Sequence, residues 1–180
     1  MFDDKGRYIL ENYKQKSTFS SFLPGISGKL GIPIWCFYVN RGQGITSFGI
    51  QDKDHSIMEF YPAHQSYQLT STVGFRTFLK VNQQYHEPFS NHTETGRMYI
   101  GMNELEIEEY WKEHNIWTNV LYYTLPGEEL GGLIRKVTLT NHSNQSQNIE
   151  FLDGMPAVVP YGVDQNSMKT MGQTTKAWMQ

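Results

Sequence analysis

The chain has 180 residues, with 15 Lys and Arg against 18 Asp and Glu, so its formal net charge is −3. This length suits one domain over residues 1–180 with a substantial core. The near-neutral charge, without a basic run, argues against partners such as nucleic acid, and no apolar stretch approaches the roughly 20 residues that a membrane span needs.

The composition indicates strands rather than helices. Alanine, the best helix former, occurs only at Ala63, Ala157 and Ala177. Aromatic residues make up 14% of the chain, and 16 Gly and 7 Pro are distributed along it. Aromatic and β-branched side chains fit pleated, half-buried surfaces, while Gly and Pro mark turns. We therefore expect many short strands.

The first half of the chain contains a series of short runs that predict strands, at residues 17–23, 32–40, 45–51, 56–62 and 73–81. The run IPIWCFYVN at 32–40 is continuously apolar, which predicts a strand buried on both faces. It contains the only cysteine, Cys36, so no internal disulfide can form and a reducing compartment is indicated. The polar N-terminus shows no signal peptide. These observations favour a soluble, cytoplasmic protein.

The connections between these runs are polar or rich in glycine. Arg41-Gly42-Gln43-Gly44 predicts a hairpin connection, and Asp52-Lys53-Asp54 predicts a polar turn. In the last of the five runs, one face would carry alternate residues, namely Val73, Phe75, Thr77, Leu79 and Val81.

The second half continues in the same way, with strands expected at 97–102, 103–111, 116–125, 132–141 and 148–163. In NELEIEEYW, Leu105 and Ile107 alternate with Glu104, Glu106 and Glu108, which predicts a strand with a solvated acidic face. Only residues 164–179 look helical. About ten strands joined by short turns predict an all-β fold, an antiparallel β-sandwich.

Few residues suggest catalytic chemistry. The six histidines lack the spacing of zinc ligands, and the Gly42–Gly44 segment leads into a strand rather than the helix that a phosphate-binding loop needs. No Gly-x-Ser-x-Gly motif supports a serine hydrolase. We therefore expect no cofactor, no metal site and no catalytic residue within the chain.

Carbohydrate recognition is the chemistry that the remaining polar and aromatic residues favour. Aromatic rings stack on sugar faces, while amide and guanidinium groups pair with hydroxyls. Such groups gather between residues 39 and 68 at or beside turns, where binding residues usually lie. The candidate substrate-binding residues are Arg41, Gln43, Asp52, His55, Tyr61 and Tyr67. The alternative interpretation is that Arg41 and Asp52 tie adjacent turns together.

Several strings in the chain are similar to a known family. FSSFLPGISG, IPIWCFYVNRGQGITSFGIQDKDHSIMEFYPAHQSYQ, GFRTFLK and FLDGMPAVVPYGV resemble the N-terminal region of cellobiose-phosphorylase-like proteins. These are glycoside phosphorylases, from the group once called glycosyltransferase family thirty-six and its oligo-β-glucan phosphorylase relatives. The resemblance spans nearly all of the chain, and NRGQ and KDHSIMEF are its most specific strings.

The resemblance implies part of a galactose-mutarotase-like super-sandwich, followed in the parent enzyme by a linker and an (α/α)6 barrel. The barrel would supply the general acid and bind inorganic phosphate as co-substrate, so no catalytic residue is carried over to this chain. The implied partners are an oligosaccharide, the C-terminal catalytic barrel and a second copy in a homodimer. Strands after residue 180 would complete the sandwich, so we expect an unpaired sheet edge and an uncovered apolar patch.

Three functions remain open. The chain is either the N-terminal fragment of a β-glucoside phosphorylase, a free-standing carbohydrate-binding sandwich, or a hydrolase whose residues lack a recognisable pattern. Trp178, close to the last residue, favours the first, because natural termini are usually polar.

Overall fold

The computed structural model describes residues 1–25, 27–93 and 95–179, apart from the side chains of residues 175, 176, 178 and 179. The side chain of Trp178, on which the expectation of a longer parent chain depends, is thus outside the described part. The described chain forms twelve strands and three α-helices. The strands are β1 (Tyr8–Glu11), β2 (Ser20–Leu23), β3 (Ile34–Val39), β4 (Ile45–Ile50), β5 (Ser56–Met58), β6 (Arg76–Val81), β7 (Gln84–His86), β8 (Arg97–Ile100), β9 (Glu104–Trp111), β10 (Ile116–Thr124), β11 (Leu133–Asn141) and β12 (Ile149–Gly154). The helices are α1 (Ala63–Val73), α2 (Gln165–Thr170) and α3 (Gly172–Met179).

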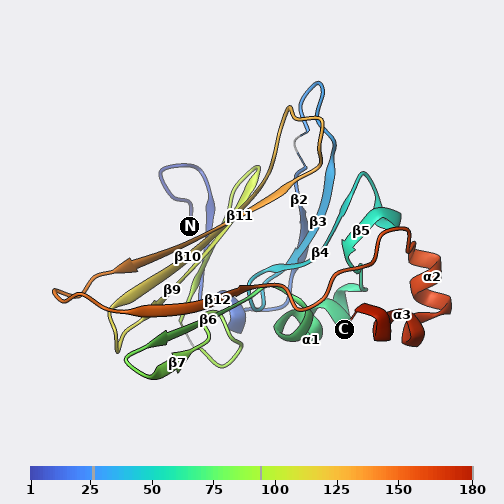
Figure 1. The fold of residues 1–180 in the computed structure, drawn as a ribbon. Helices are drawn as coiled ribbons and strands as arrows, with labels where there is room; N and C mark the ends of the chain where they lie inside the picture. The colour runs from blue at the N-terminus through green and yellow to red at the C-terminus, as the bar shows by residue number, and fades with distance from the viewer. Residues whose placement is uncertain (26, 94, 180) are drawn as a thin grey trace.

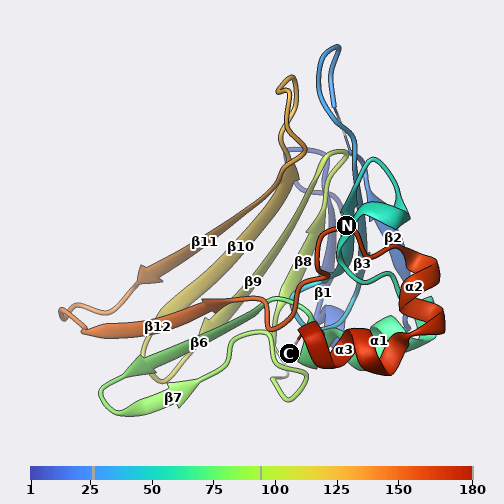
Figure 2. The ribbon, with the colours of Figure 1, turned by 45° about the vertical axis from the view of Figure 1, so that its right-hand side comes forward.

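The strands form three antiparallel sheets, which confirms the predicted all-β sandwich. Sheet A has five strands in the order β1-β8-β9-β10-β11, sheet B has four in the order β2-β3-β4-β5, and sheet C has three in the order β12-β6-β7. The long strands of sheet A extend across the molecule, with sheet B toward one end and sheet C toward the other (Figures 1 and 2). One long sheet is therefore opposed by two short ones.

Two separate apolar cores follow from this arrangement. The main core lies between sheets A and B and contains Ile45 and Phe48 of β4 with Ile107 and Val120 of sheet A. The minor core lies between sheets A and C. It consists of the buried side chains Leu79, Val81, Trp111 and Ile116, with Leu139 and Ile149 packed against them. Strands β9 and β10 contribute to both cores, because alternate side chains along each strand point to the same face.

The alternation predicted for residues 103–111 is confirmed, but its acidic face is less solvated than expected. Leu105 and Ile107 are fully buried, whereas the three glutamates on the other face are half-buried. Arg7 forms ion pairs with Glu104 and Glu106, and Arg97 with Glu108. Arg7 directly precedes β1 and Arg97 belongs to β8, and both reach the glutamates of β9, which are therefore paired rather than free.

Several details of the sequence predictions are wrong. The strands predicted at 56–62 and 148–163 end at Met58 and Gly154, and β1 and β7 are not predicted at all. The strand predicted at 32–40 is not buried on both faces, because Trp35 in β3 remains 47% exposed, partly covered by Phe22 at a ring-centroid distance of 5.6 Å. The face predicted for residues 73–81 begins only after Val73, which is the last residue of α1. The sequence predicts helix only at residues 164–179, so this eleven-residue helix is unexpected; it packs against β3 and β4.

The C-terminal prediction is confirmed, since residues 164–179 form α2 and α3. Asp164 caps α2 by accepting a hydrogen bond from the Ser167 backbone N–H at 2.7 Å, as Asp at this position commonly does. Among the described helices, none has both the length and the apolar character to cross a membrane.

Candidate functional site

The candidate site is a cavity of about 430 Å³ near the meeting point of the three sheets, which we call the junction cavity. Its size falls within the roughly 300–1,000 Å³ of small-molecule sites. The β3–β4 turn, the end of α1, the start of β6 and the segment before β8 form its walls. The lining residues are Gly42, Gln43, Thr70, Ser71, Phe75, Arg76, Glu87, Pro88, Phe89, Ser90, Asn91 and His92.

The β3–β4 turn contributes Gly42 to the wall of the cavity. The Gly44 N–H donates to the Arg41 carbonyl at 3.0 Å, which closes the predicted hairpin connection. Gly42 has a φ of +51°, and a Cβ at this position would lie 2.8 Å from Cγ2 of Thr70 in α1. Only glycine accommodates both the left-handed backbone and this close approach.

A polar cluster joins the three sheets beside the cavity. This junction cluster consists of Gln43 from the turn of sheet B, Arg135 from β11, and Thr77 and Asp153 from sheet C. Arg135 Nη2 donates to Gln43 Oε1 at 2.6 Å and to Asp153 Oδ1 at 2.9 Å, while Nη1 pairs with the other Asp153 oxygen. Gln43 Nε2 donates to Thr77 Oγ1 at 3.0 Å. Each sheet therefore supplies at least one hydrogen-bonding partner.

Two aromatic rings lie near the guanidinium of Arg135, with ring centroids 5.0 Å away for Phe75 and 5.9 Å away for Tyr122. This packing allows cation–π attraction. Burial raises the pKa of Tyr122 to about 12, with Arg135 acting in the opposite direction. Burial on its own would lower the pKa of Arg135, but Tyr122 and Asp153 raise it above its ordinary value. Arg135 is therefore a permanent cation.

An ion pair lies at the edge of the junction cavity. Arg76 Nε and Nη2 donate to the two carboxylate oxygens of Glu87 at 2.7 and 3.0 Å, in a bidentate geometry. Both side chains are about a third exposed, at 33% and 29%. The hydrogen bond from Arg76 to Glu87 raises the pKa of Arg76. These two planar groups stay accessible at the cavity.

The far wall of the cavity is held by a buried ion pair. Lys14 Nζ lies 2.9 Å from Glu109 Oε2, and both side chains are 2% exposed. Lys14 also donates to the Ser90 carbonyl at 3.2 Å, and Glu109 accepts from the Phe89 backbone N–H at 3.0 Å. The ion pair between Lys14 of the N-terminal segment and Glu109 of β9 therefore fixes the backbone of two cavity residues, Ser90 and Phe89.

Charges and hydrogen bonds determine the protonation of this pair. Burial raises the pKa of Glu109, but hydrogen bonds from His86, Thr93 and Lys14 and the charge of Lys14 outweigh burial and hold it below its ordinary value. Burial lowers the pKa of Lys14, with Glu109 opposing that effect. Glu109 is therefore an anion at neutral pH.

The predicted site residues do not form a single site. Arg41 and Gln43 lie in the turn before β4, and Asp52 and His55 lie after it. This six-residue strand separates the two pairs by about 20 Å at about 3.3 Å per residue. Tyr61, whose hydroxyl hydrogen-bonds Glu59, precedes α1, and Tyr67 lies half-buried within that helix.

The tie between Arg41 and Asp52 considered from the sequence is absent among the described contacts. Arg41 Nη1 and Nη2 donate to the carbonyls of Asn40 and Lys16 at 2.7 and 3.2 Å. Asp52 instead accepts from His55 Nδ1 at 2.8 Å, and this hydrogen bond is the main reason that its pKa is lowered. Each side chain is held by its own local contacts.

Sequence reasoning missed Arg76, Glu87 and Asn91 as cavity residues. Asn91 Oδ1 accepts from the Gly42 N–H at 3.2 Å, and so links the segment before β8 to the β3–β4 turn. The sequence does place polar, planar side chains close to Phe75 and Phe89, and this pattern could have indicated a binding site. These residues lie outside the stretch 39–68 that contains the predicted candidates. Their convergence depends on tertiary structure.

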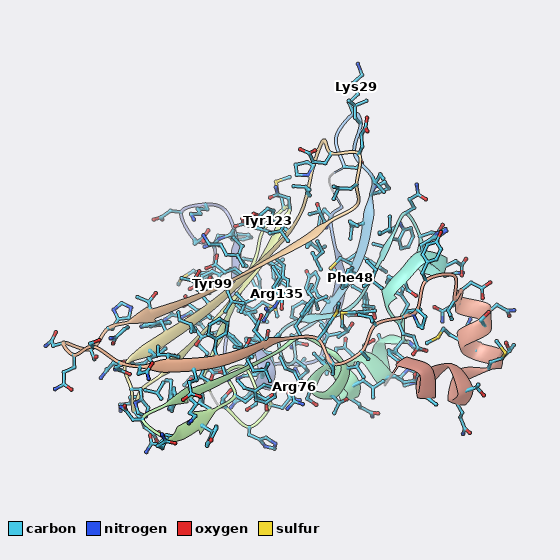
Figure 3. All side chains as sticks on the ribbon, in the orientation of Figure 1. Lys29, Phe48, Arg76, Tyr99, Tyr123 and Arg135 are labelled. Carbon is cyan, nitrogen blue, oxygen red and sulfur yellow. The ribbon has the colours of Figure 1, made fainter. Side chains whose placement is uncertain are left out.

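The junction cavity combines guanidinium, carboxylate, amide and hydroxyl groups with a half-buried ring, Phe75. Figure 3 shows Arg76 at the lower part of the molecule and Arg135 between the layers. In the described part of the chain, no three His, Cys, Asp or Glu side chains lie together as a metal site. Comparisons with family models, with curated proteins and with solved structures find no match to this chain.

Proposed function

We propose that this chain is the carbohydrate-binding N-terminal β-sandwich of a glycoside phosphorylase that acts on β-linked gluco-oligosaccharides. The observation that carries the proposal is the junction cavity, which the partly exposed side chains of Arg76 and Glu87 line together with the aromatic residue Phe75. Planar donors and acceptors next to an apolar ring suit a ligand with equatorial hydroxyls and apolar ring faces. The all-β sandwich and the family-like strings are consistent with this function.

The cavity would bind the sugar through groups that are already oriented. Glu87 is held by Arg76, and Asn91 is held by the Gly42 N–H, so little side-chain entropy would be lost on binding. Glu87 oxygens accept hydrogen bonds from hydroxyls, while the remaining Arg76 N–H groups donate them. A neutral saccharide can use both kinds of partner at once.

In the proposed parent enzyme, the reaction is reversible phosphorolysis, which gives a sugar 1-phosphate and a shortened acceptor. Such a reaction needs an acid to protonate the glycosidic oxygen and a basic pocket for phosphate as the nucleophile. Our proposal assigns both to a C-terminal catalytic barrel, and a cytoplasmic location supplies the phosphate. The sandwich contributes oligosaccharide binding and a surface for the barrel.

Isothermal titration with cellobiose, laminaribiose and sophorose tests the proposal. We expect at least one disaccharide to bind and Arg76→Ala to weaken that binding about tenfold or more. Arg97→Ala is a matched control, because Arg97 also forms an ion pair with a glutamate but lies on β8 in sheet A, away from the cavity. Absence of binding at millimolar saccharide, or equal weakening by both variants, would contradict the assignment.

Phosphorolysis assays test whether the sandwich has catalytic activity of its own. We expect the 180-residue chain to release no glucose 1-phosphate from these disaccharides in the presence of inorganic phosphate. Turnover by the highly purified chain would show that its own residues carry out the chemistry, and would overturn the assignment of catalysis to a barrel.

A further inference from the structure

A second cavity, of about 520 Å³, lies at the opposite end of β4 from the junction cavity. The β4–β5 hairpin forms one wall and residues 159–164 form the other. We call it the hairpin cavity. Its apolar lining includes Ile50, Ile57, Val159 and Val163, and His55 of the candidate residues lies beside them.

The segment over the hairpin cavity is fixed at both ends. The Val159 N–H donates to the Ile57 carbonyl at 2.9 Å, and the Gln165 N–H donates to Asp54 Oδ1 at 3.3 Å. Both contacts join the segment to the β4–β5 hairpin, about a hundred residues earlier in the chain. Hydrogen bonds therefore hold the two walls of the cavity, the β4–β5 hairpin and residues 159–164, against each other.

A tight turn within this segment places the exposed Tyr161 at the rim of the hairpin cavity. The Val163 N–H donates to the Pro160 carbonyl at 3.2 Å, and Gly162 has a φ of +86°. Glycine with positive φ at the third position is typical of a type II turn. Tyr161, at the second position, is fully exposed, so both faces of its ring are open beside the cavity.

The polar groups around the hairpin cavity favour a neutral ligand. Asp52, Asp54 and Asp164 bring three carboxylates, against Lys53 and the imidazole of His55. An anionic ligand would be repelled, whereas hydroxyl groups can donate to the carboxylates and to Nε2 of His55, whose Nδ1 already donates to Asp52. Ser56 Oγ, beside the same cavity, is buried and has no hydrogen-bond partner among the described residues.

From these features we infer that the hairpin cavity is a second carbohydrate subsite, which binds one neutral hexopyranose ring with Tyr161 stacked on its apolar face. Asp54 and His55 hydrogen-bond the hydroxyls of that ring. The ligand class rests on the proposed function, but the site and its residues are independent of the junction cavity. Since β4 separates the two cavities by about 20 Å, each binds its own part of an oligosaccharide.

A titration of the ¹⁵N-labelled chain with cellobiose or laminaribiose tests this inference by NMR. We expect shifts at the amides of His55, Tyr161 and Gly162, and about tenfold weaker binding there in Tyr161→Ala. Tyr161→Phe keeps the ring and should retain binding. Tyr85→Ala removes another exposed tyrosine, on β7, and should leave the affinity unchanged.

The same titration distinguishes failure of this inference from failure of the proposed function. Shifts confined to the junction cavity and abolished by Arg76→Ala would overturn the second subsite and leave the proposed function in place. Absence of shifts at both cavities with every saccharide would overturn both. Stronger binding of inorganic phosphate than of neutral sugar at Tyr161 would overturn the ligand class of the second subsite.

Discussion

Nη2 of Arg135 lies 2.6 Å from Oε1 of Gln43, although the two residues are 92 positions apart in the chain. The hydrogen bond connects β11 of sheet A to the β3–β4 turn of sheet B, and the same guanidinium holds Asp153 of sheet C. The three sheets are therefore joined by one buried cation as well as by their apolar cores.

Arg135→Ala should destabilise the fold by about 3 kcal/mol, because removal of one partner leaves a largely buried carboxylate without its cation. The Arg135 and Asp153 side chains are 9% and 21% exposed. Urea denaturation at pH 7 measures the loss. Arg97→Ala, at an arginine whose side chain is 46% exposed, should cost less than about 1 kcal/mol. Equal costs for the two variants would contradict a structural role for the junction cluster.

The Lys14–Glu109 pair makes stability dependent on pH in the acid range. The pKa of Glu109 is lower in the folded chain than in the unfolded chain, where it is about 4.3. The folded state then binds fewer protons, so the contribution of Glu109 is complete above about pH 5 and is lost as the pH falls through the folded pKa. Urea melts between pH 7 and 3 should show a smaller decrease for Glu109→Gln than for the native chain.

A matched control for this pH dependence is Glu150→Gln. Glu150 also pairs with a lysine, Lys80, but its side chain is 66% exposed. We expect this variant to follow the native pH profile closely. The assignment fails if Glu150→Gln flattens the profile as much as Glu109→Gln does.

The close approach of the β3–β4 turn to α1 can be tested with a double-mutant cycle. Gly42→Ala should cost about 1–2 kcal/mol from the left-handed backbone alone, plus the contact of the new Cβ with Cγ2 of Thr70. Thr70→Ser removes that methyl group and keeps the hydroxyl that donates to the Ser66 carbonyl. Thermal melts should therefore show that Thr70→Ser partly rescues Gly42→Ala, and strict additivity would exclude the contact.

Two sheet edges on the same side of the sandwich predict self-association. Within the described chain, β11 pairs with β10 alone and β12 with β6 alone. Phe151 and Leu152 in β12 are 68% and 70% exposed, and free edges with apolar side chains favour pairing with another chain. Analytical ultracentrifugation should show association that increases with concentration and is weakened by Leu152→Lys. Leu130→Lys, at another exposed leucine, should have no effect; a monomer at all concentrations would refute the prediction.

Most strands could be predicted because one face of each is apolar. In β9 and β11 the strict alternation of side chains appears directly in the sequence, and the structure buries the expected face of β9 and half-buries that of β11. The helix α1 could not be found in this way. Its buried residues, Ser66 and Thr70, are polar, so the helical spacing of its inner face produces no apolar pattern.

The candidate site was less predictable than the strands. The sequence placed polar groups at the turns on either side of β4, but the direction of that strand sends them to opposite ends of sheet B. Arg76 and Glu87 meet across the β6–β7 hairpin, where Leu79 pairs with His86, but this pair shares a cavity with Gly42 only because the hairpin lies beside the β3–β4 turn and α1. Contacts of this kind depend on how the sheets stack, which no local pattern of residues specifies.

The unequal sizes of the two cores imply that parts of the sandwich open independently. The minor core has four buried residues, so sheet C should unfold locally at a lower free energy than sheets A and B. Amide hydrogens of β6, β7 and β12 would then exchange with solvent faster than those of β3 and β4. Arg76 belongs to the less stable part and Gly42 to the more stable one. A sugar that contacts both would slow exchange in sheet C, and its affinity would include the free energy of keeping that sheet closed.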